Sequence, residues 1–307
     1  MTVSVVICTR DRPDDLADCL ASLARQTRRP HEVIVVDASD GDASAVRVRT
    51  WAARSEIPVD CLRTAPGLTR QRNLGAARAR GDVVTFLDDD VVLDPGYLEA
   101  IAALFEAAPG LGGAEGTVAF PPLRGRRRLA NACRRFFLMN ALGPRRGVRR
   151  SGFATYDPWP RGVRFTNCLV GCNMSYPRDV LHRFRFDEWF DGYGLCEDQD
   201  FSYRVARERP LVQTPHARLE HRLSPVGREA LPALHEMTAV NHYYFVRKNM
   251  PQTPRTWLAF CWSEVGELLS VVKTGDGAAI AGKLRGYRRI LRTLGGGPAR
   301  PVREALS

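Results

Sequence analysis

The sequence predicts an α/β fold in which a mostly parallel central sheet is flanked by helices and followed by a helical C-terminal extension. Three observations predict this fold. Strand-like and helix-like segments alternate over about the first 120 of the 307 residues. Carboxylates close two of the strand-like segments, at Asp37 and at Asp88. Beyond residue 226 the apolar residues recur at helical spacing.

The N-terminal part supplies the regular elements of the sheet. Buried strands are predicted for three apolar, β-branched runs: VSVVICT (3–9), EVIVVDAS (32–39) and DVVTFLDD (82–89). Helices are predicted for DDLADCLASLARQ (14–26), LTRQRNLGAARA (68–79) and PGYLEAIAALFEA (95–107), the last begun by Pro95.

The pattern changes after residue 120. Residues 121–165 contain proline, glycine and the basic clusters RGRRR and RRGVRR, so we expect an excursion from the sheet with a short helix near residues 129–142. Regular alternation then resumes with a strand in NCLVGCNMSYP (167–177), a helix from Glu197 and a strand in LVQTPHARLEH (211–221).

The C-terminal residues 226–307 are expected to form helices, one of them basic and amphipathic. In residues 280–294 one stripe is apolar and half of the other positions are basic. The stripe consists of Ile280, Leu284, Tyr287, Leu291 and Leu294, and the basic residues are Lys283, Arg285, Arg288, Arg289 and Arg292. Such a helix packs on its own domain or lies on an anionic membrane surface, and the pattern alone leaves both open.

Charge and cysteine content limit the partners and the compartment. The net charge of +11 indicates a polyanionic partner or an arginine-rich lineage, and the basic clusters lack the interleaved aromatics and motifs of nucleic-acid binding. We therefore expect no nucleic acid partner. The 8 cysteines form no C-x-x-C pair and are expected to be reduced and buried. With no signal-peptide layout and no long apolar stretch, the expected location is cytoplasmic, with peripheral binding to the inner face of the membrane as an option.

Three consecutive carboxylates, Asp88, Asp89 and Asp90, end the third predicted strand. Each raises the cost of ionising its neighbours, so a cation is expected between them. Ligands of open α/β sheets bind outside the carboxyl ends of the strands, and carboxylates there suit a hard divalent cation that carries a diphosphate. A solvated acidic turn is the alternative interpretation.

Four motifs in order resemble the family 2 glycosyltransferases with a GT-A fold over about residues 3–222. They are VSVVICTRDRPDDLADCLASLARQ, EVIVVDAS, TRQRNLGAARARGDVVTFLDDDVVLDPGYL and GCNMSYPRDVL followed by FDEWFDGYGLCEDQDFSYRV. The resemblance implies a nucleotide-sugar-binding half at 1–120 and an acceptor-binding half at 121–225. It also implies a role for each residue that matches a motif.

On the donor side, the resemblance implies that the base and ribose lie against Thr9, Arg10 and Asp37 and that Arg70 and Asn73 face the nucleotide and diphosphate. Arg72 is expected on the solvent side of its helix. Asp88 and Asp89 match the positions that contact the nucleotide sugar. Asp90 matches the direct ligand of Mn2+ or Mg2+, with Asp88 and His221 as further ligands.

On the acceptor side, the resemblance implies that Asp198 is the catalytic base and that Glu197 orients the acceptor. Acidic residues at a helix start are also ordinary partners of the helix dipole. Trp159, Trp189 and Tyr193 are candidates to stack on sugars, although large aromatics usually belong to the core.

The function implied is that of a metal-dependent inverting glycosyltransferase that moves a single sugar from a nucleotide-diphosphate sugar to a hydroxyl of a glycan or lipid-linked acceptor, in cell-envelope or exopolysaccharide biosynthesis. QTPRTW (252–257) is one residue longer than the Q-x-x-R-W element of processive synthases, which favours single transfer. Two alternatives remain: a catalytically silent nucleotide-sugar-binding protein, or a basic scaffold that binds membrane or nucleic acid.

Overall fold

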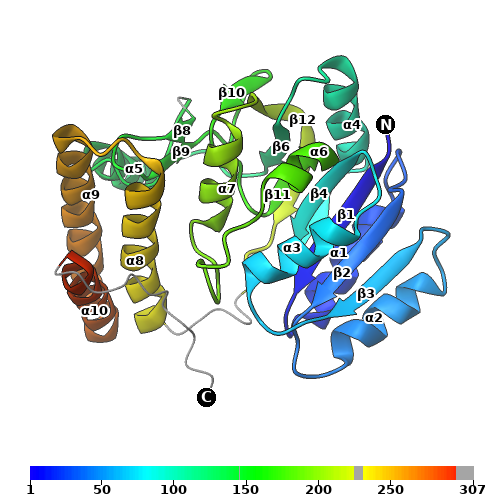
Figure 1. Ribbon diagram of the computed structural model, residues 1–307, viewed down its shortest axis with the longest axis horizontal. Helices are drawn as coiled ribbons and strands as arrows, with labels where there is room; N and C mark the ends of the chain where they lie inside the picture. The colour runs from blue at the N-terminus through cyan, green and yellow to red at the C-terminus, as the bar shows by residue number, and fades with distance from the viewer. Residues whose placement is uncertain (145, 225–230, 295–307) are drawn as a thin grey trace.

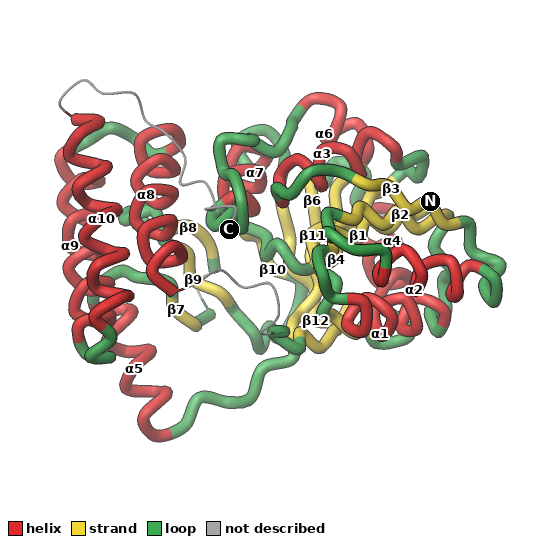
Figure 2. Tube along the Cα trace, turned by 90° about the horizontal axis from the view of Figure 1, so that it is seen from below, coloured by secondary structure: helices red, strands yellow, loops and turns green. Residues whose placement is uncertain are grey.

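The structure is a computed structural model that describes residues 1–144, 146–224 and 231–294. A mixed β-sheet with helices on both faces occupies one side of the molecule, and a group of long helices stands beside it (Figures 1 and 2). The sheet part begins with β1 (Val3–Thr9), α1 (Pro13–Ala24), β2 (Glu32–Asp37), α2 (Ala43–Ala52), β3 (Val59–Arg63), α3 (Leu68–Arg78), β4 (Val83–Asp88), β5 (Val91–Leu93), α4 (Tyr97–Ala107) and β6 (Gly113–Val118).

The chain then leaves the sheet and returns to it. This part comprises α5 (Gly125–Phe136), β7 (Ala141–Leu142), β8 (Gly147–Val148), β9 (Ala154–Tyr156), β10 (Arg164–Thr166), β11 (Asn173–Pro177), α6 (Arg178–Arg183), α7 (Glu197–Val205) and β12 (Leu211–His221). The C-terminal helices are α8 (Leu231–Asn249), α9 (Pro254–Val272) and α10 (Gly277–Leu294). The predicted domain boundary between residues 225 and 226 falls within residues 225–230, which lie outside the described part.

The order of the strands in the main sheet is β10-β12-β6-β11-β4-β1-β2-β3, with β5 paired to β12. β4, β1, β2 and β3 run parallel, whereas β11 is antiparallel to both β4 and β6. In this register Thr9 pairs with Asp37 and Cys8 pairs with Asp88. The carboxylates that end β2 and β4 therefore lie at the same edge of the sheet.

Helices cover both faces of the sheet because its central strands are apolar on both sides. Figure 2 shows α1, α2 and α4 on one face and α3, α6 and α7 on the other. Two separate clusters of buried apolar side chains result. Val5 and Ile7 of β1 belong to one cluster, and Val6 belongs to the other. The predicted α/β architecture is confirmed.

Helix α3 packs closely on the strands that precede the site. A Cβ at Gly75 would lie only 2.3 Å from Val6 Cγ1, so no side chain fits there without a shift. The close approach lets Gln71 Nε2 donate to the carbonyls of Thr9 (3.1 Å) and Val36 (2.9 Å). These bonds satisfy the carbonyl groups at the ends of β1 and β2.

The C-terminal helices are joined by a buried charge cluster. Glu264 of α9 accepts from His242 Nδ1 (2.7 Å) of α8 and pairs with Lys283 Nζ (3.1 Å) of α10. Tyr287 also donates to Glu264, at 2.9 Å. Burial opposes ionisation of Glu264, but His242 and Lys283 outweigh it and hold its pKa at about 2. The cluster links all three helices through paired groups.

The apolar stripe predicted for residues 280–294 is only partly buried in α10. The buried positions of the helix are small residues and Lys283, together with Ile290, whereas three leucines of the predicted apolar stripe, Leu284, Leu291 and Leu294, are exposed. The reason is close packing on α8, where a Cβ at Gly286 would lie 2.8 Å from Ala239 Cβ. That approach brings the Lys283 ammonium to Glu264, so the basic residue is buried and the leucines face outward.

Two further expectations differ from the structure. The helix expected near 129–142 begins and ends earlier, at 125–136, because the chain turns at Leu138, which has a φ of +56°. Three cysteines, Cys61, Cys133 and Cys261, are exposed rather than buried. Within the described ranges, none of the helices has the length and apolar character needed to cross a bilayer.

We predict that Glu264→Ala lowers the free energy of unfolding by about 3–5 kcal/mol, because His242 and Lys283 would lose their shared buried anion. The unfolding midpoint in urea and the melting temperature measure this loss. Glu56→Ala, at an exposed ion pair with Arg29, is the matched control and should change stability by less than about 1 kcal/mol. Equal losses in both variants would contradict a stabilising role of the cluster.

Candidate active site

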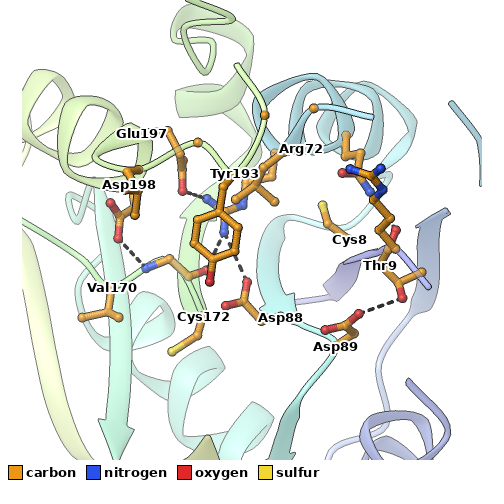
Figure 3. Close-up of a pocket in the computed structure, with 18 of the residues that line it drawn as sticks. Cys8, Thr9, Arg72, Asp88, Asp89, Val170, Cys172, Tyr193, Glu197 and Asp198 are labelled. Atoms are coloured by element: carbon orange, nitrogen blue, oxygen red, sulfur yellow. Dashed lines mark hydrogen bonds and ion pairs between the residues drawn. The ribbon is translucent and has the colours of Figure 1, made fainter. Parts of the chain in front are cut away.

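A pocket of about 270 Å³ opens at the carboxyl ends of β1 and β4. Its walls come from three parts of the chain: the strand ends, helix α3 with the loop before it, and the segment from Val170 to Cys172 with the start of α7. Figure 3 shows Asp88 and Asp89 on one side and Arg72, Glu197 and Asp198 on the other. Acidic groups thus face each other across one cavity.

The three consecutive carboxylates have different surroundings. Asp89 is buried and accepts from Thr9 Oγ1 (2.8 Å) and Arg12 Nη1 (3.1 Å). Burial raises the pKa of Asp89 to about 7, although Arg12 and Thr9 oppose the rise. Asp88 is half-buried and lines the pocket. Asp89 is therefore held by the protein, whereas Asp88 is open to a ligand.

Asp90 lies beside His221 because β5 pairs with the end of β12. In this antiparallel pair Val91 lies opposite His221, and His221 Nε2 comes within 3.0 Å of Asp90 Oδ1. Asp90 Oδ2 accepts from the backbone N–H of Ser224 at 2.9 Å. Burial opposes ionisation, yet the His221 and Ser224 hydrogen bonds outweigh it and lower the pKa of Asp90.

Asp88, Asp90 and His221 form a set that fits a divalent cation. One ligand atom from each residue can be chosen such that all lie within 4.8 Å of one another. Two carboxylate oxygens and an imidazole nitrogen suit Mn2+, and the carboxylates also suit Mg2+. The donor chemistry thus agrees with the ligand set that the sequence predicts.

Arg72 joins the two sides of the pocket and is buried, so its expected place on the solvent side is wrong. Its guanidinium pairs with Glu197 Oε1, lies 3.4 Å from Asp88 Oδ1 and donates to the Gly171 carbonyl at 3.0 Å. Burial disfavours the charge, but Glu197 and Asp88 outweigh it and raise the pKa of Arg72. Arg72 is thus a permanent cation between carboxylates of β4 and α7.

Glu197 and Asp198 begin α7 directly after Cys196, whose φ of 72° lies in the left-handed region. That conformation is costly for a residue with a side chain, and it turns the first helical residues toward the pocket. Burial raises the pKa of Glu197 to about 8, with Arg72 opposing. Burial also raises the pKa of Asp198, against Arg72 and the N–H groups of Gly171 and Gln199.

The two carboxylates of α7 differ in the bonds they make. Both oxygens of Asp198 accept from backbone N–H groups, of Gly171 at 2.8 Å and of Gln199 at 2.7 Å. Glu197 Oε2 is buried and makes no hydrogen bond to any residue that the structure describes. A raised pKa is typical of groups that exchange protons near neutral pH, and an uncommitted oxygen can accept from a ligand hydroxyl.

The structure brings most of the predicted site residues together. Seven of them line the pocket: Thr9, Arg10, Asp88, Asp89, Glu197, Asp198 and His221. Asp90 contacts His221 from below the strand end, and Asp37 is buried at the end of β2, where it accepts from Ser39 N (2.9 Å) and Arg63 Nη1 (3.2 Å). Tyr193 also lines the pocket.

Other candidates lie elsewhere. Arg70 donates to the Pro66 carbonyl at 2.9 Å, and Asn73 bonds to both the N–H and the carbonyl of Phe186, so neither lines the pocket. Trp189 stacks on Tyr244 of α8 with ring centroids 3.6 Å apart, which is a packing role. Trp159 donates to the Phe120 carbonyl outside the pocket.

Sequence reasoning missed Arg12, Gln71 and the role of Arg72. The signal for Arg72 is the spacing of Thr69, Arg72 and Gly75, which places the arginine on the same helix face as a small residue packed against a strand. Arg12 and Gln71 carry no comparable signal, because their roles depend on loops and strand ends that meet only in the fold.

Comparison with known proteins places this geometry in one family. A family model described as glycosyl transferase family 2 matches residues 4–157. An uncharacterized glycosyltransferase of Bacillus subtilis, YwdF, is 34% identical over 227 residues, which cover 74% of this chain and 76% of the relative. Validoxylamine A glucosyltransferase of Streptomyces hygroscopicus subsp. limoneus is 29% identical, over 70% of this chain and 52% of the relative.

The chain belongs to the family 2 glycosyltransferases. Two solved structures share its GT-A fold at low identity. A GalNAc-T7 structure with UDP, GalNAc and Mn2+ has a TM-score of 0.61 at 16% identity and covers 87% of this chain and 54% of its own. The mannosyltransferase PcManGT from Pyrobaculum calidifontis, in complex with GDP-Man and Mn2+, has a TM-score of 0.58 at 19% identity, over 95% of this chain and 82% of its own.

We predict that Arg72→Gln destabilises the fold more at high pH than at low pH. Without the guanidinium, the raised pKa of Glu197 rises further. When the pKa of a carboxyl is higher in the folded state than in the unfolded state, the folded state loses stability as the pH increases from the lower pKa to the higher one. Melting curves between about pH 5 and pH 9 measure the effect. Arg78→Gln, on the same helix but exposed, is the control. A loss that does not depend on pH would contradict this role of Arg72.

Proposed function

We propose that this glycosyltransferase moves one sugar from a nucleotide-diphosphate sugar to a hydroxyl of a glycan or lipid-linked acceptor, with inversion at the anomeric carbon. The observation that carries the proposal is the arrangement of two acidic groups across one pocket. A cation-ligand set, Asp88, Asp90 and His221, stands on one side, and the buried pair Glu197–Asp198 stands on the other. Arg72 lies between them.

The donor would bind over the ends of β1, β2 and β4. Thr9, Arg10 and Asp37 would contact the base and ribose, and Asp88 and Asp89 the ribose and sugar. The shared level of Thr9, Asp37 and Asp88 at one sheet edge supports this assignment. We propose that α3 passes near the nucleotide at Arg70 and Asn73. Because the side chains of these two residues bond to neighbouring loops, we propose no contact between them and the nucleotide.

Asp90, Asp88 and His221 would hold Mn2+ or Mg2+. When bound, such an ion supplies Lewis-acid stabilisation of the negative charge that develops on the departing nucleoside diphosphate. The two similar structures contain Mn2+, one with UDP and GalNAc and the other with GDP-Man, which supports the proposal for this chain. The protein contributes the ligand set, and Ser224 and His221 orient Asp90 within it.

The transfer would be a single displacement. The acceptor hydroxyl oxygen forms a bond to the anomeric carbon, the bond from that carbon to the diphosphate oxygen breaks, and the electron pair leaves with the diphosphate. Asp198 would take the hydroxyl proton, and the raised pKa of this carboxyl favours that role. Glu197, fixed by Arg72, would orient the hydroxyl through its free Oε2.

Residues 1–120 would then bind the donor and residues 121–225 the acceptor, in cell-envelope or exopolysaccharide biosynthesis. The proposed acceptor-binding role of residues 121–225 is supported by the ten arginines between Glu115 and Asp157, where no acidic residue occurs. A strongly basic acceptor half suits acceptors that carry phosphate or lie at an anionic surface.

We predict that Asp198→Asn abolishes transfer, by about 10²-fold or more, while donor binding is retained, because the amide keeps the shape of the side chain and cannot accept the proton. Turnover is measured as release of nucleoside diphosphate, and donor binding by calorimetry. Glu208→Gln, at an exposed residue in the turn after α7, is the control. Loss of donor binding together with turnover would rule out Asp198 as the base.

We predict that the donor raises the melting temperature only when Mn2+ or Mg2+ is present. In Asp90→Ala the donor should not raise the melting temperature even with metal. The measurement is a thermal-shift screen against UDP-, GDP- and dTDP-sugars, each with metal or chelator. Glu220→Gln, an exposed carboxyl beside His221, should behave as the parent protein. Stabilisation by a donor that persists in chelator would argue against the proposed metal dependence.

A further inference from the structure

The outward face of α9 is apolar. Six of its exposed residues lie on one side of the helix: Leu258, Cys261, Trp262, Val265, Leu269 and Val272. The five large ones are each at least 40% exposed and follow one another at intervals of four, three, four and three. Helices at the surface of a globular protein normally turn polar residues outward, so a continuous apolar stripe indicates a binding surface.

Helix α5 lies at the same end of the molecule and is strongly cationic. None of its residues is buried, and Leu129 and Phe136 are also exposed. Six exposed arginines occupy or precede it: Arg124, Arg126, Arg127, Arg128, Arg134 and Arg135. Among the described residues, none of the six makes an ion pair. The helix thus presents positive charge without compensation by the protein.

The cationic helix and the apolar stripe are in direct contact. Phe137 stacks on Trp262 with ring centroids 4.9 Å apart, and Phe136 meets the same ring edge-on at 5.3 Å. Trp262 Nε1 donates to the Phe136 carbonyl at 2.9 Å. A Cβ at Gly266 would lie 2.4 Å from Phe137 Cβ, so the chain at the end of α5 sits close against α9.

Helix α10 adds to this surface. Figures 1 and 2 show α9 and α10 side by side at the end of the molecule away from β1, β2 and β3. Leu284 and Leu291 of α10 are exposed, as are Arg288 and Arg292, which lie next to them on the helix. Apolar and cationic groups therefore alternate across the same region.

We propose that the α9 stripe, together with the arginines of α5, docks this enzyme on a bilayer that contains anionic lipids. The inference rests on the proposed function, since it makes the membrane the place where a lipid-linked acceptor is met. A bilayer satisfies both halves of the surface: the acyl boundary takes up the leucines and Trp262, and the lipid phosphates pair with the arginines.

Other occupants fit less well. A nucleic acid would pair with the arginines but leave the apolar stripe in water. A second copy of this chain related by twofold symmetry would cover the stripe but place one set of arginines against another, without acidic residues on α5 to separate them. The combination of an apolar stripe and unpaired cations therefore favours lipid.

The test is flotation of the full chain with vesicles of phosphatidylcholine, with and without phosphatidylglycerol. Binding to the anionic vesicles is expected. It should fall by at least about tenfold in Leu258→Glu/Leu269→Glu, which charges the stripe, and in Arg126→Ser/Arg127→Ser/Arg128→Ser, which removes headgroup contacts. The arginine variant changes only exposed positions and keeps the test decisive if the stripe variant does not fold.

The controls are Val46→Glu, at an exposed apolar residue of α2, and Arg25→Ser/Arg49→Ser/Arg54→Ser, at exposed arginines of the sheet domain. Both should bind vesicles as the parent does. Metal-dependent stabilisation by the donor is measured in every variant and should be unchanged, which separates this surface from the donor site.

Three results would overturn the inference. The first is no vesicle binding by a parent protein that binds its donor normally. The second is equal binding to neutral and anionic vesicles. The third is a dimer in sedimentation velocity that Leu258→Glu/Leu269→Glu dissociates without any effect of vesicles. Absence of donor binding with intact vesicle binding would instead contradict the proposed function.

Discussion

The buried guanidinium of Arg72 is the interaction on which the candidate site depends. It neutralises part of the charge of Asp88 and Glu197, which come from β4 and α7 and would repel each other without a cation between them. Its own position depends on packing, because α3 can approach β1 only where Gly75 has no side chain. The backbone contact and the charge arrangement are therefore one constraint: a change in either displaces the two sides of the pocket relative to each other.

Acidic and basic residues are distributed unevenly along the chain. The candidate site gathers Asp88, Asp89, Asp90, Glu197 and Asp198, whereas residues 116–156 contain ten arginines and no acidic residue, and α10 carries five basic residues and no acidic one. Among the described residues of the C-terminal helices, the buried Glu264 is paired with His242 and Lys283. A chain with a net charge of +11 thus keeps its cations at the surface, except where a carboxylate in the interior requires one.

Much of the sheet and of the acidic site could be predicted from the sequence, since both depend on local patterns. Long apolar runs defined β1, β2 and β4, and the Asp triplet and the Glu197–Asp198 pair each lie within a few consecutive residues. β3 and β6 were missed because their sequences, VDCLR and GAEGTV, carry charges or glycines and become strands by pairing with neighbours. The same limit applied to Arg72 and Lys283, because a helical pattern cannot distinguish a solvated cation from one that meets a carboxylate from a distant segment.

The pairing of β5 with β12 has a consequence for the order of events during synthesis. Asp90 leaves the ribosome early, whereas His221 belongs to the last strand of the sheet, and only the ladder between Val91 and His221 brings the two together. A nascent chain that has completed β1 to β4 has the strand ends of the pocket but lacks both this histidine and the start of α7. Translation proceeds at about 5–20 residues per second, so an incomplete chain persists for seconds with its acidic loop uncovered. The contact between Asp90 and His221 can therefore form only after β12 has been synthesised.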